Sequence, residues 1–123
     1  MIVKYTVSIK NIFAEDYINK VTEENILNLA NIYILKKQWL ICILMLEEYL
    51  ENNSPTIESY NCISFCYLST KLYNISEYYY KKALNLDPSN IICLKNLANI
   101  YSTNYMNDKI KQEIIHKQIK QQL

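Results

Sequence analysis

The chain has 123 residues, of which 50% are hydrophobic, with thirteen basic and twelve acidic side chains and a formal net charge of +1. This length suits one domain, and the near balance of charge gives no indication of a nucleic-acid or anionic-membrane partner. The chain also contains no glycine. Phosphate-binding loops, dinucleotide-binding fingerprints and nucleophile elbows all depend on glycine, so the composition excludes these classes of catalytic motif.

Residues 1–22 belong to no clear structural unit, and we expect them to form an N-terminal arm or a short helix that caps the domain. Lys4 and Lys10 interrupt the first apolar residues, so no continuous core of a secretory signal is visible. The longest apolar run, Trp39–Leu46, is far shorter than the roughly 20 residues that span a bilayer. We therefore expect a soluble protein with no membrane span, located in the cytoplasm or the nucleus.

A short segment recurs along the chain at a fixed interval. The hexapeptide NLANIY occupies residues 28–33 and again residues 96–101, and CISFCY lies halfway between them at residues 62–67. Within each copy, apolar and small residues alternate at the three- and four-residue spacing that is typical of one helix face. Self-similarity at a period of about 34 residues predicts helix–turn–helix units.

The middle unit, residues 57–90, resembles the tetratricopeptide repeat (TPR) most closely. That pattern has large, apolar, small and aromatic residues in its first helix, and small, aromatic, alanine and proline residues in and after its second. In the chain these positions hold Tyr60, Ile63, Ser64, Tyr67, Ser76, Tyr80, Ala83 and Pro88. The unit at 23–56 keeps most of the pattern, whereas the unit at 91–123 keeps only its first half. The resemblance therefore implies a three-repeat domain over residues 23–123, with a half-degenerate last repeat.

The resemblance implies an all-α fold, an α-solenoid of three antiparallel helix pairs that coil as a right-handed superhelix. We expect helices over residues 23–36, 38–51, 57–70, 74–86, 91–103 and 108–120. Ser54 or Thr56, and Ser89 or Asn90, stand where helix N-caps are expected. Because the chain lacks glycine, the turn at residues 71–74 should place another residue type in left-handed backbone.

Catalysis and metal binding have little support in the sequence. His116 is the only histidine, and we interpret it as a solvent-exposed residue of a polar helix. Cys62 and Cys66 are four residues apart, but further metal ligands would have to come from Cys42, Cys93 or His116, at no recognised spacing. We interpret all four cysteines as reduced, small core residues, and we expect neither enzymatic activity nor a metal or other cofactor.

In TPR proteins the first helices of the pairs line a concave groove that binds peptides. One variant of the family clamps the acidic C-terminus of heat-shock proteins with lysine and asparagine side chains. The corresponding positions here hold Leu27, Asn31, Cys62, Ile92 and Asn96, none of which is a cation. The chain is therefore not expected to bind that carboxylate.

The sixth and ninth positions of the first and third repeats instead resemble the asparagine ladder of O-GlcNAc-transferase-type repeats, with Asn28, Asn31, Asn96 and Asn99. Cys62 and Phe65 interrupt this ladder in the middle repeat. A side-chain amide offers a donor and an acceptor together, which matches the peptide backbone of an extended partner. We expect a non-catalytic adaptor that binds a peptide or helix of a partner protein. The alternatives are a structural subunit or fragment of a large assembly, such as the anaphase-promoting complex or a ciliary-transport particle, and an accessory segment of an enzyme. The groove candidates are Leu27, Asn28, Asn31, Asn61, Phe65, Ile92, Asn96 and Asn99.

Overall fold

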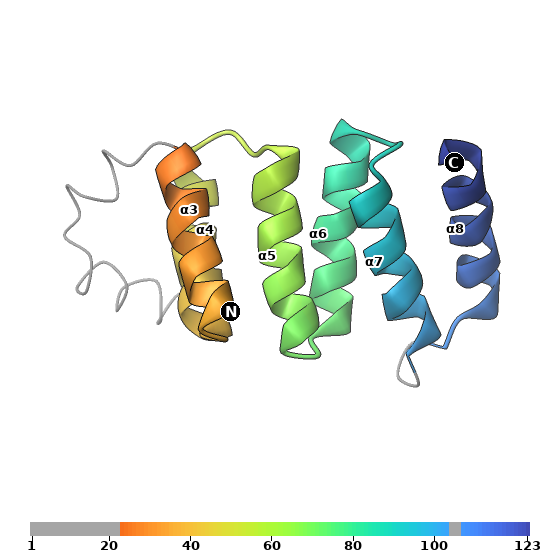
Figure 1. The fold of residues 1–123 in the computed structure, drawn as a ribbon, viewed down its shortest axis with the longest axis horizontal. Coiled ribbons are helices and arrows are strands. Elements are labelled where there is room, and N and C mark those ends of the chain that lie inside the picture. Colours follow the sequence, from red (N-terminus) through yellow and green to blue (C-terminus); the bar gives the residue numbers. More distant parts are fainter. Residues whose placement is uncertain (1–22, 104–106) are drawn as a thin grey trace. The chain divides into compact units, whose positions relative to one another are not determined.

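A computed structural model describes residues 23–103 and 107–123. Within these two ranges the chain forms six α-helices and no strand. The all-α fold and the six predicted helices are confirmed, with ends that differ from prediction by at most two residues, and the predicted arm at 1–22 lies outside the described residues. The helices are α3 (Glu23–Leu35), α4 (Trp39–Asn52), α5 (Ile57–Ser69), α6 (Tyr73–Leu86), α7 (Ile91–Ser102) and α8 (Lys109–Gln122) (Figure 1).

Polar side chains cap three of these helices. The Thr56 hydroxyl accepts a hydrogen bond from the Ser59 N–H (3.2 Å), and the Ser59 hydroxyl accepts one from the Thr56 N–H (2.9 Å), which completes a capping box. The side chain of Asn90 caps α7, and that of Asp108 caps α8. Of the alternatives that the sequence left open, the structure therefore selects Thr56 and Asn90.

In two helix pairs, the turn between the helices contains a lysine with left-handed backbone. Lys37, between α3 and α4, has a φ of 57°, and Lys71, between α5 and α6, has a φ of 64°. In both turns, the N–H groups of the lysine and of the residue after it donate to carbonyls of the last helical turn at 2.9–3.0 Å. This is the Schellman arrangement, whose left-handed position is usually glycine because other residues cost about 1–2 kcal/mol there. The prediction of a left-handed residue after α5 is confirmed at Lys71.

The α3–α4 and α5–α6 pairs repeat the same buried contact. The Cys42 thiol donates to the carbonyl of Ala30 at 3.7 Å, and the Ser76 hydroxyl donates to the carbonyl of Ser64 at 2.8 Å. The two donors, Cys42 and Ser76, are 34 residues apart, and so are the two acceptors. The same interval separates the two left-handed lysines, and it separates the first residues of α3, α5 and α7. The 34-residue period of the sequence is therefore also a period of the structure.

The chain divides into two compact units, residues 1–55 and 56–123. In the described part of the first unit, α3 packs against α4. Ile26 and Ala30 of α3 are buried, and α4 is buried on most of its sides from Cys42 to Tyr49. The apolar run that was too short for a membrane span thus forms the core helix of this unit.

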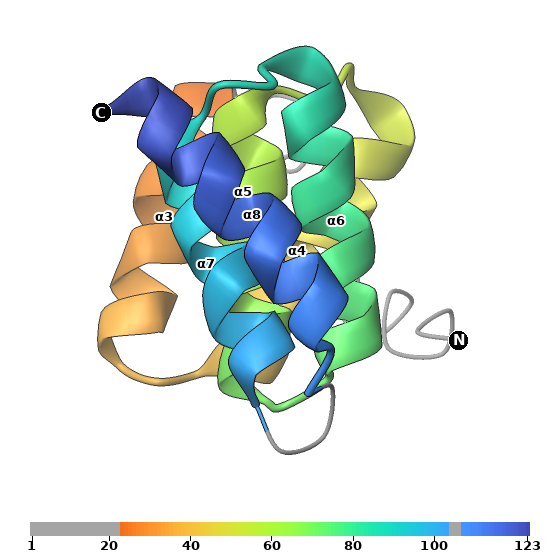
Figure 2. The same ribbon diagram turned by 90° about the vertical axis from the view of Figure 1, so that its right-hand side faces the viewer.

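In the second unit each helix packs against the next one. The α5–α6 pair is followed by α7, which contacts both α6 and α5, and α8 packs on α7 (Figures 1 and 2). This order of contacts is that of a helical-repeat solenoid, as predicted. The buried cluster at the centre of the unit comprises Tyr80, Ala83, Cys93, Leu94, Leu97, Ile100, Tyr101 and Ile115.

Glu77 of α6 links three helices of the second unit. Its Oε2 atom accepts hydrogen bonds from the Tyr101 hydroxyl of α7 (2.5 Å) and the Lys111 ammonium of α8 (3.3 Å), and it pairs with Lys81 of α6 (3.4 Å). Partial burial raises the pKa of Glu77, but the hydrogen bonds from Tyr101 and Lys111 and the charges of the two lysines outweigh it. The pKa therefore lies below its ordinary value of 4.5.

We expect the second unit to lose stability in acid through Glu77. Because its native pKa is lower than its unfolded one, the carboxylate stabilises the fold above about pH 4.5, and this contribution is lost as the pH falls through the native pKa. Glu77→Gln should lower the free energy of unfolding at neutral pH by about 1.5–3 kcal/mol, the scale of a hydrogen bond to a charged group. Urea unfolding at pH 7 and pH 3 measures this. If acid destabilised parent and variant equally, Glu77 would not be the responsible group.

Candidate functional site

Five of the eight predicted groove residues lie in the second unit, on α5 and α7. Asn61 and Phe65 are four residues apart on α5, and Ile92, Asn96 and Asn99 follow at four- and three-residue spacing on α7. Residues at these spacings share one face of a helix. Since α5 and α7 are in contact, these two faces lie on neighbouring helices (Figure 1).

The polar and apolar members of this surface are accessible to solvent. Phe65 is 38% exposed and Ile92 58% exposed, Asn99 is exposed, and Asn96 is half-buried. Neither the Asn96 nor the Asn99 side chain is hydrogen-bonded to another described residue. Their amides therefore retain both donor and acceptor for a ligand. We call these four residues the α5/α7 face.

Asn61 has a structural contact that the sequence did not predict. Its Oδ1 atom accepts a hydrogen bond from the Cys93 thiol of α7 at 2.6 Å. Burial raises the pKa of Cys93 to about 11 against the opposing effect of this hydrogen bond, so the thiol keeps its proton at neutral pH. Asn61 thus joins α5 to α7, and one of the two acceptor positions of its Oδ1 atom is already used within the fold.

The other three predicted residues belong to the first unit and are all on α3. Asn28 and Asn31 are exposed, and Leu27 is half-buried. Neither asparagine side chain is hydrogen-bonded to another described residue, as at Asn96 and Asn99. A ladder of asparagines that runs through both units stays a prediction.

The described residues show no cluster suited to a metal ion. Within residues 23–103 and 107–123, no group of three or more histidine, cysteine or acidic side chains could hold one. Cys42, Cys66 and Cys93 are buried, Cys62 is half-buried, and none of these four described residues forms a disulfide. His116 is an exposed residue of α8. The three buried cysteines therefore act as small packing residues in this fold.

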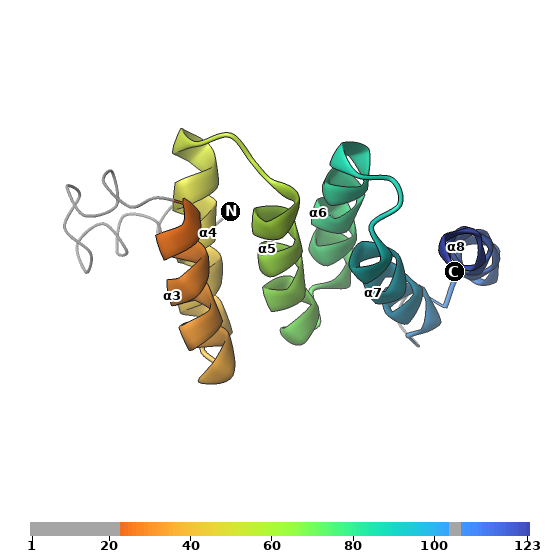
Figure 3. The ribbon, with the colours of Figure 1, turned by 45° about the horizontal axis from the view of Figure 1, so that its top comes forward.

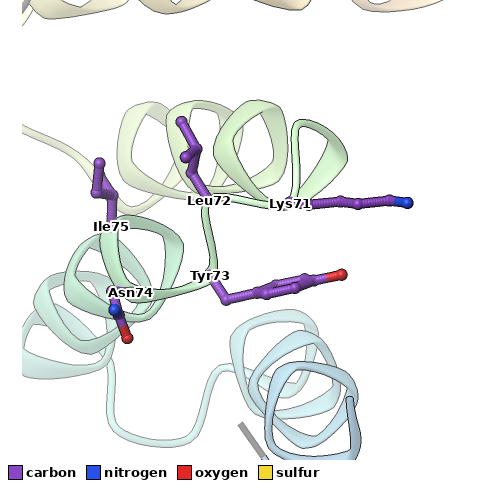
Figure 4. A pocket seen from close by; sticks show the side chains of 5 residues that line it. All are labelled: Lys71, Leu72, Tyr73, Asn74 and Ile75. Carbon is purple, nitrogen blue, oxygen red and sulfur yellow. The ribbon is translucent and has the colours of Figure 1, made fainter. Parts of the chain in front are cut away.

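A pocket of about 370 Å³ lies beside the turn between α5 and α6 and is lined by residues 71–75. Figure 4 shows that Leu72 and Ile75 extend to one side, Lys71 and Tyr73 to another, and Asn74 away from both. The polar groups do not converge on one point. The arrangement therefore offers no set of side chains that could act together on a small ligand.

A second surface was not predicted. The ribbon shows that α8 crosses α7 obliquely (Figures 2 and 3). A pocket of about 270 Å³ opens between α6, α7 and α8. We call it the basic pocket, because lysines of two helices border it. One sequence signal could have indicated it: α8 carries four lysines against one glutamate, together with exposed isoleucines. Its lining includes Lys81, Leu84, Leu97, Tyr101, Lys111 and Ile114.

Comparison with known proteins gives one distant relative. No family model matches the chain. Over 70 residues the chain is 33% identical to a protein of Guillardia theta described as "Uncharacterized protein ycf37". The matched segment covers 57% of this chain and 38% of that protein, so the chain spans well under half of its relative. Among the helices of the described residues, none combines the length and apolar character needed to cross a membrane.

Proposed function

We propose that this chain is a TPR-type adaptor, a non-catalytic module that binds an extended segment of a partner protein. The recurrence of the Cys42–Ala30 contact at Ser76–Ser64, and of the left-handed turn at Lys37 and Lys71, supports the repeat assignment. The relative from Guillardia theta is itself described as uncharacterized and supplies no activity. The proposal therefore depends on the fold and on the α5/α7 face.

The observation that carries the proposal is the pair of accessible amides at Asn96 and Asn99. Each can donate to a backbone carbonyl and accept from a backbone N–H of the same partner peptide, whatever its side chains are. Phe65 on α5 and Ile92 on α7 add exposed apolar area on the same two neighbouring helices, where an apolar side chain of the partner could lose its contact with water. Together these four residues favour a ligand that is bound mainly through its backbone.

The test compares partner capture by the whole chain and by its Asn96→Ala/Asn99→Ala variant. Partners are cross-linked in native cell extract, identified by mass spectrometry, and their affinity is then measured by fluorescence anisotropy with peptides from the cross-linked segment. Each lost amide contact is worth about 0.5–1.5 kcal/mol, so the affinity should fall about five- to a hundredfold. Phe65→Ala should weaken binding as well.

Lys82→Ala is the control, because Lys82 lies on α6 with its ammonium 4.9 Å from the ring centre of Tyr78. It should leave the affinity unchanged, and thermal melts should show that the Asn variant is folded. Unchanged affinity of the double variant, with loss of binding when residues 1–22 or α8 are altered, would retire the groove model. The chain would then fit the alternative, a structural TPR subunit that contacts its neighbours by its ends and flanks.

A further inference from the structure

The basic pocket lies on the opposite side of α7 from the α5/α7 face. Leu97 and Tyr101 of α7 contribute to its lining, whereas Asn96 and Asn99 do not. At 100° per residue, the first pair points roughly opposite to the second pair around the helix. A ligand in the basic pocket would therefore not compete with a peptide on the α5/α7 face.

The pocket has a cationic end and an apolar end. Lys81 and Lys111 meet at one carboxylate oxygen of Glu77, from α6 and α8 respectively. Leu84 and Ile114 follow these lysines by three residues, and the two helices run in the same direction (Figure 1). One helical turn therefore separates the charged end from the apolar end on both sides of the pocket.

Charge is not balanced at the cationic end. Two lysines share the single carboxylate of Glu77, and their side chains are 55% and 42% exposed. Each ammonium has three donors, so each can bind a further oxygen acceptor. The whole second unit has the same sign, with eight lysines against five acidic residues. The field at this surface thus attracts an acidic partner.

The apolar end distinguishes a protein partner from a purely anionic one. Ile114 is 53% exposed, and it lines the pocket together with the half-buried Leu84. A phosphate chain would gain nothing from these side chains, whereas a leucine or phenylalanine would lose its contact with water there. An acidic residue next to a large apolar residue matches both ends of the pocket.

We propose that the basic pocket is a second binding site, which takes an acidic segment of a partner protein. One large apolar side chain of the segment packs between Leu84 and Ile114. A neighbouring carboxylate binds the ammonium groups of Lys81 and Lys111. The site is independent of the α5/α7 face, so the chain can hold two protein segments at once.

The test uses fluorescein-labelled nonapeptides in which a central leucine or phenylalanine is flanked by glutamate and aspartate. Matched peptides carry glutamine and asparagine instead. Fluorescence anisotropy with the full chain should show binding that is at least about tenfold tighter for the acidic peptides and weaker at high salt. Lys81→Gln/Lys111→Gln should reduce the affinity at least about tenfold, because both charge-assisted contacts are lost.

The control double variant is Lys109→Gln/Lys120→Gln, which changes the net charge equally at exposed positions on the far side of α8. It should change the affinity less than about twofold, since exposed charges away from the site are screened. Ile114→Glu keeps the lysines and should abolish binding. Ile110→Glu adds the same charge one turn earlier, at a residue 74% exposed and outside the pocket lining, and should have a small effect.

Several outcomes would overturn the proposal. One is the absence of binding by every acidic peptide at millimolar concentration, and another is equal binding of the acidic and amide peptides. If the two double-lysine variants lost the same amount of affinity, the effect would be due to net charge and not to the pocket. If the peptides fail but Ile114→Glu abolishes self-association in sedimentation velocity, the pocket joins copies of this chain. If they fail but phosphatidylserine vesicles bind with the same dependence on Lys81 and Lys111, it is a lipid site.

Discussion

Replacing Leu94 by alanine is expected to lower the free energy of unfolding of the second unit by about 2–5 kcal/mol. Leu94 is fully buried on α7 within the central cluster. Truncation removes the transfer free energy of its methyl groups and leaves a cavity that the surrounding helices can fill only in part. Urea denaturation followed by circular dichroism measures the loss.

Leu86→Ala is the matched control for this change. Leu86 lies in the last turn of α6 and is 52% exposed, so the same atoms are removed from a site that already contacts water. Its effect should stay within about 0.5 kcal/mol, as for most surface substitutions. Equal losses at Leu94 and Leu86 would mean that α7 does not bury the face assigned to it.

Ala83→Leu should also destabilise the second unit, by about 1–3 kcal/mol, for the opposite reason. Ala83 has no exposed surface and lies in the same cluster as Tyr80. A leucine there has no space and would push the neighbouring helices apart. Asn85→Leu, an exposed position on α6, places the same side chain in solvent as a control. If the thermal melts of Ala83→Leu and the parent coincide, the register of α6 is wrong.

Much of the fold could be predicted because its signals are local. The helix starts follow from caps such as Thr56 and Asn90, and the period follows from small residues where paired helices cross. The last pair follows the period less well. Its second helix begins at Lys109, two residues later than the period requires, and Ile115 is buried where Ile114 would be expected. The half-degenerate pattern of the last repeat indicated that its second helix departs from the 34-residue period. It did not indicate by how many residues the helix is shifted.

The candidate site could be predicted only in part, because surfaces depend on contacts between distant residues. The accessibility of Asn96 and Asn99 follows from their places on an amphipathic helix. The hydrogen bond between Asn61 and the Cys93 thiol does not, because it joins residues 32 positions apart whose separation depends on how α5 and α7 pack. The basic pocket depends in the same way on the oblique crossing of α8 over α7.

The burial of the cysteines gives each unit an internal reporter of its own opening. Cys42 is buried in the first unit, and Cys66 and Cys93 are buried in the second. A thiol reagent reacts only with an exposed thiolate, so modification of these residues requires the local structure to open first. In a stack of repeats, neighbouring units need not open together. The rates at which the natural thiols are labelled therefore measure, without any substitution, whether the two units unfold as one cooperative body or separately.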